Sequence, residues 1–451
     1  MSPRISLQRL RGKIDDRSAK IGVIGMGYVG LPVAALFAEA GFDVVGVEIR
    51  ADRVRQINRG ESPIAGNEPG LADLISAVVK SGKLSATTDY DALRDREVVL
   101  IDVETPVSDQ HVPGYNALLA ALRALGPVLM DGALVVVEST IAPGTMDGIV
   151  RPALEQASGR LLGPGFHLGH CPERVMPGKL LGNLRNVSRV VGGMSPETAE
   201  IMVTLYGQIV HADLDPADCL TAELVKTTEN AYRDVQIAFA NEVALICEAV
   251  GGDVWKVREL VNKSPNRQMH LPGAGVGGHC IPKDPWLLTH AALENGLQPR
   301  LIPIARSIND SMPAHMLELL SSALKEVGRE LKGARIGILG YSYLENSDDT
   351  RNSPSEVLVR LLREAGAEPV VHDPWVEKYS GDLATRLHGC SGIVLMVAHE
   401  LYRTTNLMAL DPSLREAVIV DGRGISRGRA RPRDPRAPRL IGVSAPRTGS
   451  T

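Results

Sequence analysis

The run Gly25-Met-Gly-Tyr-Val-Gly30 is the feature that most constrains how this chain can fold. It follows a short apolar segment, Ile21-Gly-Val-Ile24, and precedes an Ala-rich stretch that ends near Ala40. Glycines at this spacing, between a strand and a helix, permit a tight turn and let the backbone approach a pyrophosphate closely. The N-terminus of the helix that follows adds free N–H groups and a positive potential. The sequence therefore predicts a dinucleotide-binding βαβ unit.

Glu48 indicates which dinucleotide binds there. It ends the next predicted strand, residues 43–48, at about the 20-residue distance at which an acid binds the adenosine ribose diol. A carboxylate at this position favours NAD over NADP. Arg50 and Arg53 lie nearby in the sequence and weaken the preference, because an arginine can accept a 2′-phosphate. We predict NAD as the cofactor.

Strands and helices alternate along most of the chain. Further apolar strands are expected at 98–103 and 134–138, and a second α/β block at 334–340, 369–373 and 392–397. This alternation predicts parallel sheets covered by helices on both faces. Residues 220–250 carry apolar side chains at helical spacing, with neither Pro nor Gly before Gly251. The predicted fold class is α/β, with two Rossmann-like doubly wound domains joined by a long central helix.

Composition excludes several classes of partner. The chain has 49 basic and 53 acidic side chains, a net charge of −4, which argues against nucleic acid or a membrane surface as partner. Aromatic residues are 4% of the chain, so base-stacking platforms are not expected. Five cysteines without paired spacing fit a reducing compartment. No apolar run reaches the roughly 20 residues of a membrane span, and no signal peptide is visible. We predict a cytoplasmic protein.

Cys280 lies in the run Gly273-Ala-Gly-Val-Gly-Gly-His-Cys-Ile-Pro-Lys-Asp-Pro285. Glycines expose backbone N–H groups, and charged neighbours can tune a thiolate, so a covalent nucleophile is one interpretation. A buried, inert thiol is the other. A dehydrogenase needs a nucleophilic thiol when it oxidises an aldehyde, which the thiol holds as a thiohemiacetal and then as a thioester. Lys226 and Asn230, four residues apart on one helix face, could hold an oxyanion.

Two other kinds of chemical site have partial support in the sequence. His167, His170 and Cys171 could bind a metal, but a closed zinc site needs four donors, so no metal is expected. His279 beside Cys280 suggests a hydrolase dyad, but such pairs meet in space from distant positions.

Several motifs follow one another along the chain: Gly25-x-Gly-x-x-Gly30, Ser139-Thr140, Cys171-Pro-Glu-Arg174, Lys226-x-x-x-Asn230, Gly277-Gly-His-Cys280 and Asp348-Asp-x-Arg351-x-Ser-Pro354. In this order they resemble the UDP-glucose/GDP-mannose dehydrogenase family over roughly residues 20–425. Within the family, Cys171-Pro-Glu-Arg-Val175, residues 229–242 and Gly277–Pro282 look most like the UDP-N-acetyl-D-mannosamine 6-dehydrogenase branch, with the UDP-N-acetylglucosamine branch close behind.

The resemblance implies a four-electron oxidation at C6 of a UDP-N-acetylhexosamine, with two NAD molecules as hydride acceptors. It implies that Cys280 captures the aldehyde and that Lys226 assists proton movement and stabilises oxyanions with Asn230. Thr140, Glu173 and Asp284 would order or activate the hydrolytic water. The implied NAD contacts are Gly25, Gly27, Tyr28, Val29, Gly30, Glu48, Arg53, Thr105, Thr140 and Arg351. The implied substrate contacts are Arg174, Val175, Lys226, Asn230, Arg233, Arg267, Gly277, Tyr343 and Arg423.

The resemblance also implies a homodimer or larger homo-oligomer built on the long helix. The expected parts are an N-terminal extension (1–18), an NAD-binding domain (19–212), a central helical dimerisation domain with Cys280 (213–325), a UDP-sugar-binding domain (326–425) and an Arg/Pro-rich tail (426–451). We expect the extension to be frayed and most of the tail to be a loop or disordered.

The chain departs from the family at several positions. Leu344 follows Tyr343 where the family has a lysine, Ser264-Pro-Asn266 replaces a common His-Pro-Arg, and Lys283 is more typical of the glucose branch. A UDP-N-acetylglucosamine or UDP-glucose 6-dehydrogenase therefore remains an alternative. A catalytically silent nucleotide-sugar-binding protein is the alternative from a different class, against which the set of Cys280, Lys226, Asn230 and Asp284 argues.

Overall fold

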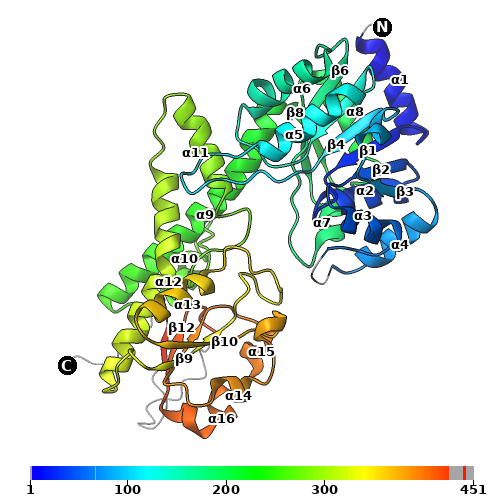
Figure 1. Ribbon diagram of the computed structural model, residues 1–451. Coiled ribbons are helices and arrows are strands. Elements are labelled where there is room, and N and C mark those ends of the chain that lie inside the picture. Colours follow the sequence, from blue (N-terminus) through cyan, green and yellow to red (C-terminus); the bar gives the residue numbers. More distant parts are fainter. Residues whose placement is uncertain (1–2, 65, 67, 426–439, 443–451) are drawn as a thin grey trace. The chain divides into compact units, whose positions relative to one another are not determined.

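The computed structural model describes residues 3–64, 66, 68–425 and 440–442, and the chain divides into two compact units (Figure 1). Helix α9 (Cys219–Val250) begins in the first unit and continues into the second. Helix α11 (Asp284–Glu294) begins in the second unit and continues into the first. The first unit contains Met1–Glu229 and Trp286–Gln298, and the second contains Asn230–Pro285 and Pro299–Thr451.

The first unit is built on an eight-stranded sheet in the order β3-β2-β1-β4-β5-β6-β7-β8. All neighbouring strands are parallel except β6 and β7, which are antiparallel, so the predicted parallel sheet is confirmed apart from this one pair. The strands are β1 Lys20–Ile24, β2 Asp43–Val47, β3 Leu84–Thr87, β4 Val98–Ile101, β5 Ala133–Val137, β6 Phe166–His170, β7 Arg189–Gly193 and β8 Leu214–Asp218.

Helices cover both faces of this sheet because its strands are apolar on both sides. In β4, Val98 and Leu100 join one core, whereas Val99 and Ile101 join the other. The first core is closed by α1 (Pro3–Asp15), α2 (Gly30–Glu39), α3 (Ala51–Asn58), α4 (Leu71–Lys80), α7 (Leu180–Asn186) and α8 (Pro196–Tyr206). The second is closed by α5 (Asn116–Leu125) and α6 (Arg151–Ser158), with the short helices η1 (Tyr90–Leu93), η2 (Gly126–Val128) and η3 (Met146–Val150).

Helix α1 corrects the expectation that residues 1–18 form a frayed extension. Leu7, Leu10 and Ile14 recur at helical spacing and are buried in the first core, where α1 packs against α8. An apolar stripe of this kind makes a polar and basic segment helical once a partner helix covers it.

The second unit holds a parallel five-stranded sheet in the order β10-β9-β11-β12-β13. Its strands are β9 Arg335–Leu339, β10 Glu368–His372, β11 Gly392–Leu395, β12 Val418–Asp421 and β13 Leu440–Gly442. The accompanying helices are α10 Val254–Val261, α12 Leu301–Glu326, α13 Pro354–Glu364, η4 Glu377–Tyr379, α14 Leu383–Leu387, α15 Glu400–Thr404, α16 Leu407–Leu410 and η5 Pro412–Glu416.

The long helix agrees with the prediction from sequence, whereas the end of the chain contains a strand that was not predicted. Helix α9 matches the predicted span of 220–250 within one residue and ends before Gly251, whose φ is +82°. The loop predicted for the tail falls largely on residues 426–439, which lie outside the described residues. Strand β13 lies beyond them and pairs with β12, which sequence analysis did not predict.

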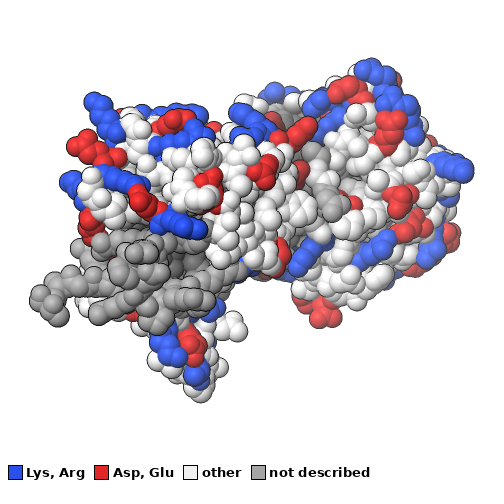
Figure 2. All heavy atoms as spheres, turned by 90° about the horizontal axis from the view of Figure 1, so that it is seen from below, with Lys and Arg blue, Asp and Glu red and all other residues white. Residues whose placement is uncertain are grey.

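The surface carries charges of both signs, and the described helices are not of the membrane-spanning kind. Figure 2 shows Lys and Arg side chains interspersed with Asp and Glu over the described residues of the face drawn. Within the ranges that the structure describes, no helix combines the length and the apolar character that crossing a membrane requires.

Candidate active site

The glycine loop after β1 is shaped to receive a pyrophosphate. A Cβ on Gly30 would lie 2.0 Å from the carbonyl oxygen of Gly25, and Gly25 itself has a φ of +93°. Only glycine is tolerated at such contacts. A Cβ on Gly27 would meet nothing within 4 Å, so the loop is open on that side. Tyr28 and Val29 complete the loop and pack against the first core. These residues fit a bound dinucleotide.

Glu48 lies beside this loop with its carboxylate already oriented. Its side chain accepts a hydrogen bond from the Met26 N–H at 3.2 Å and another from the Arg50 N–H at 3.0 Å. Arg53 Nη1 lies 3.9 Å from Glu48 Oε2. A carboxylate in this place can accept hydrogen bonds from the ribose hydroxyls of NAD, whereas it would repel the 2′-phosphate of NADP.

The loops that follow β4 and β5 are tied together in the first unit. Thr105 Oγ1 donates to the carbonyl oxygen of Thr140 at 2.6 Å, and Ser139 Oγ donates to that of Val103 at 2.6 Å. Glu223, on α9, accepts from the N–H groups of Gly144 and Met146 at 2.7 Å each. The loop that carries Thr140 is thus held by the sheet on one side and by α9 on the other.

Lys226 and Glu173 also come together in the first unit. Lys226 is 7% exposed, and its Nζ donates to the carbonyl oxygen of Glu173 at 2.7 Å. Arg174, the next residue, forms a two-pronged ion pair with Glu229, with Nε 2.9 Å from Oε2. Val175 packs against the first core. The Arg174 guanidinium, predicted to contact substrate, is therefore engaged by a carboxylate of α9.

Cys280 is the accessible cysteine of the second unit. Cys171, Cys219, Cys247 and Cys390 are buried, whereas Cys280 is partly exposed. Burial raises the pKa of the Cys171 thiol to about 12 and that of Cys390 to about 11. A thiol with so high a pKa is not a nucleophile at neutral pH, because the thiolate is the reactive form.

Asp284 lies four residues after Cys280 and is hydrogen-bonded to Asn230 of α9. Asn230 Nδ2 donates to Asp284 Oδ2 at 2.6 Å, and Lys283 Nζ lies 2.9 Å from Asp284 Oδ1. The Asp284 N–H donates to the carbonyl oxygen of Cys280 at 2.8 Å. The second unit therefore places the Cys280 thiol and the buried Asp284 carboxylate in one turn at the start of α11, with the Asn230 amide of α9 bonded to that carboxylate.

Three family descriptions match consecutive parts of the chain. They are the NAD binding domain, the central domain and the UDP binding domain of one family, over residues 19–210, 220–311 and 337–428. The chain belongs to the UDP-glucose/GDP-mannose dehydrogenase family. It is an NAD-dependent nucleotide-sugar dehydrogenase, and the resemblance inferred from its motifs is confirmed.

Individual relatives cover nearly the whole chain of this dehydrogenase. A UDP-N-acetyl-D-mannosamine dehydrogenase of Pyrococcus horikoshii is 40% identical over 90% of this chain and 96% of its own. An NDP-N-acetyl-D-galactosaminuronic acid dehydrogenase of Ralstonia nicotianae is 36% identical over 91% and 97%. The solved structure of a UDP-D-ManNAc dehydrogenase from Pyrococcus horikoshii superimposes with a TM-score of 0.88, at 38% identity, over 94% of this chain and 99% of that one.

The remaining predicted residues of the dehydrogenase lie in the second unit. The Tyr343 side chain packs on Gly277 and Gly278, where an added Cβ would lie 2.6 and 2.8 Å from it. Arg351 belongs to this unit, whereas the cofactor loop belongs to the first. Arg423 Nε donates to the carbonyl oxygen of Met396 at 2.7 Å. Arg233 and Arg267 are exposed.

Sequence analysis missed Glu223 and Glu68. Glu223 holds the Thr140 loop, and Glu68 accepts hydrogen bonds from the Tyr28 hydroxyl and from the Gly178 N–H. Glu223 lies three residues before Lys226 on the same helix, which was an available signal. No pattern marks Glu68, because its partners are distant in the sequence.

The structure assigns His170 a structural role within the dehydrogenase. Burial lowers its pKa to about 4, and its Nδ1 lies 2.8 Å from the carbonyl oxygen of Val137. Among the described residues, no group of three or more His, Cys, Asp or Glu side chains could hold a metal ion.

Proposed function

We propose that this enzyme oxidises the C6 hydroxyl of a UDP-N-acetylhexosamine to a carboxylate, with UDP-N-acetyl-D-mannosamine as the preferred substrate. The observation that carries the proposal is the accessible thiol of Cys280, one turn before the buried carboxylate of Asp284. The similarity to relatives named for UDP-N-acetyl-D-mannosamine supports the choice of sugar. The second candidate substrate is an N-acetylgalactosamine-type sugar nucleotide, because of the name of the Ralstonia relative.

Each protein group has a proposed part in this reaction. Lys226 takes up the proton of the C6 hydroxyl, and Lys226 and Asn230 stabilise the negative oxygen that develops. Cys280 adds as a thiolate to the aldehyde carbon, which gives a thiohemiacetal whose oxidation leaves a thioester. Thr140, Glu173 and Asp284 direct water to the thioester, which releases the carboxylate and the thiol.

Bound NAD supplies the hydride acceptor for both oxidation steps. The balance is one alcohol, two NAD and one water, giving one carboxylic acid, two NADH and two protons. The residues proposed to hold the cofactor are the loop glycines with Tyr28, Val29, Glu48, Arg53, Thr105, Thr140 and Arg351. Those proposed to hold the sugar nucleotide are Arg174, Val175, Arg233, Arg267, Gly277, Tyr343 and Arg423.

The enzyme is further proposed to work in the cytoplasm as a homodimer built on α9. Several large apolar side chains of this helix are exposed, and such a set favours a protein interface. They include Tyr232 at 63%, Phe239 at 58% and Val250 at 77%. The domain division expected from sequence is retained as part of the proposal, supported by the ranges of the three family matches.

Parallel assays with UDP-N-acetyl-D-mannosamine, the galacto and gluco epimers, and UDP-glucose test the proposal. NADH absorbance and product analysis should show two NADH per sugar, with the highest kcat/KM for the manno substrate. A higher kcat/KM for another sugar would correct the substrate, and no NADH with any of them would refute the activity.

A further inference from the structure

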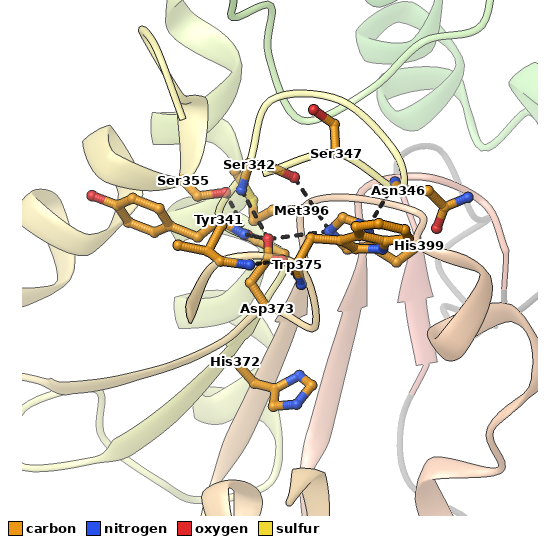
Figure 3. A network of polar contacts seen from close by, with 12 residues as sticks. Tyr341, Ser342, Asn346, Ser347, Ser355, His372, Asp373, Trp375, Met396 and His399 are labelled. Carbon is orange, nitrogen blue, oxygen red and sulfur yellow. Dashed lines mark hydrogen bonds and ion pairs between the residues drawn. The ribbon is translucent and has the colours of Figure 1, made fainter. Parts of the chain in front are cut away.

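Asp373 collects backbone donors from two loops of the second unit (Figure 3). It directly follows β10 and is fully buried. Its Oδ2 accepts from the N–H groups of Tyr341 at 2.6 Å and Ser342 at 2.9 Å, and its Oδ1 accepts from that of Trp375 at 2.8 Å. Burial opposes ionisation, but the hydrogen bonds from His399 and the backbone outweigh it and lower the pKa to about 2. The Asp373 carboxylate thus anchors the loop after β9.

His399 holds the same loop from the other side. The Asn346 N–H donates to His399 Nδ1 at 2.9 Å. A backbone N–H can only donate, so Nδ1 carries no proton and Nε2 carries it. Nε2 lies 3.1 Å from Asp373 Oδ2, and the ring is fully buried. The backbone of residues 341–346 is therefore held at both ends by one buried Asp–His pair (Figure 3).

This loop continues into the segment that contacts the Cys280 run. The Tyr343 N–H donates to the carbonyl oxygen of Asp349 at 2.9 Å. The Gly278 N–H donates to the carbonyl oxygen of Arg351 at 2.9 Å, and Asn352 Nδ2 donates to that of Gly278 at 3.0 Å. Gly278 has a φ of +91°, and the Tyr343 ring covers it so closely that a side chain would clash. The position of the loop therefore sets the backbone two residues before Cys280.

The same segment contains the positively charged Arg351. The pKa of Arg351 is raised, mainly by its hydrogen bond to Asp349 and to a smaller extent by the charge on Cys280. A guanidinium near a thiol stabilises the thiolate in return. A displaced loop would move this charge and the Gly278 backbone together.

We propose that His399 and Asp373 are positioning residues that hold loop 341–352 against the Cys280 run and so set the reactivity of the thiol and the binding of the sugar nucleotide. Neither residue is placed among those that contact substrate or cofactor. The part that concerns catalysis rests on the function proposed above, whereas the reactivity of Cys280 can be measured without turnover.

Two isosteric variants separate the two contacts of His399. His399→Asn places an amide oxygen near the position of Nδ1 and keeps an acceptor for the Asn346 N–H. His399→Gln places an amide nitrogen near Nε2 and loses that acceptor. Alkylation of Cys280 by iodoacetamide as a function of pH reports its apparent pKa. Steady-state assays report KM and kcat, and thermal unfolding reports stability.

We expect His399→Gln to raise the apparent pKa of Cys280 and to raise KM for the sugar nucleotide about fivefold, the typical effect of one lost hydrogen bond. His399→Asn should stay close to wild type. Unchanged Cys280 pKa and KM in His399→Gln, with only a lower unfolding temperature, would show a purely structural role and overturn the proposal. Equal damage in the two variants would overturn the assignment to Nδ1.

A surface variant covers the case in which buried variants fail to fold. Asn346 is exposed, has a φ of +54°, and accepts from the Glu400 N–H through Oδ1 at 3.1 Å. Asn346→Ala should therefore loosen the loop and raise the apparent pKa of Cys280, and an unchanged value would count against the proposal. If wild type turned over no UDP-sugar, the alkylation assays would still decide the positioning role.

Discussion

Asn230 and Asp284 are joined by a 2.6 Å hydrogen bond from the amide Nδ2 to the carboxylate Oδ2. This bond connects the long helix α9 to the first residue of α11, four residues after Cys280. The same carboxylate pairs with Lys283, and the side chains of both residues are largely buried. A buried carboxylate with two such partners is well placed both to hold the turn and to direct a water molecule.

We predict that Asp284→Asn reduces kcat by about 100-fold or more, the usual contribution of an acid–base group. The neutral amide also leaves Lys283 buried without its ion pair, which costs stability. Lys283→Met/Asp284→Asn is the matched control, because it removes both charges and should recover the unfolding temperature without recovering turnover. Recovery of turnover in the double variant would show that the carboxylate acts only through stability.

Cys280→Ser should abolish formation of the uronate while NAD binding persists, because a serine hydroxyl is a poor nucleophile without an adjacent base. Product analysis and NAD titration test this expectation. Cys390→Ala is the control, since that thiol is buried in a separate core and should be dispensable for turnover. Wild-type rates in Cys280→Ser would rule out the covalent intermediate.

Glu223 should make the stability of the enzyme depend on pH. Burial raises its pKa from 4.5 to about 7, although N–H groups of the Thr140 loop oppose the shift. The unfolded chain therefore loses this proton at lower pH than the folded chain, so stability falls as pH rises from about 4.5 to about 7. Glu223→Gln does not titrate there. Its unfolding temperature relative to wild type should rise across that window, and a constant difference would contradict the assignment.

Asp102 should keep its proton at a pH at which an ordinary aspartate is ionised. In the part of the chain that the structure describes, Asp102 Oδ2 and Glu138 Oε2 are buried without a hydrogen-bond partner. Burial and the neighbouring Glu138 raise the pKa of Asp102 well above its ordinary value. We predict that Asp102→Asn, whose amide can donate without a titrating proton, is more stable than wild type at alkaline pH. Urea unfolding between pH 6 and 10 tests this, with Asp102→Ala as the variant expected to lose stability throughout.

Phe239→Glu should convert the proposed dimer to a monomer, because it places a charge on the exposed apolar side of α9. Light scattering measures the mass, and circular dichroism should show an unchanged fold. Glu242→Gln, a polar change on the same helix, serves as the control. A dimer that survives Phe239→Glu would place the interface elsewhere.

Local sequence predicted those elements whose signals are local. The glycine loop, the strand that leads to Glu48 and the span of α9 follow from residue spacing and from breakers such as Gly251. Helix α1 was missed because its three apolar residues gain a partner only when α8 is in place. Strand β13 was missed because it lies within an Arg/Pro-rich tail, whose composition is typical of a loop.

The sequence by itself determined the NAD fingerprint and the family, since these depend on residue type at fixed spacing, and it supplied the residues proposed to react. Tertiary structure decided which cysteine is accessible, that Glu223 holds the Thr140 loop, and that Asp373 and His399 hold the loop that contacts the Cys280 run. Burial and hydrogen-bond partners arise from segments far apart in the chain. A side chain's reactivity depends on those partners, so its chemistry is decided only after the chain has folded.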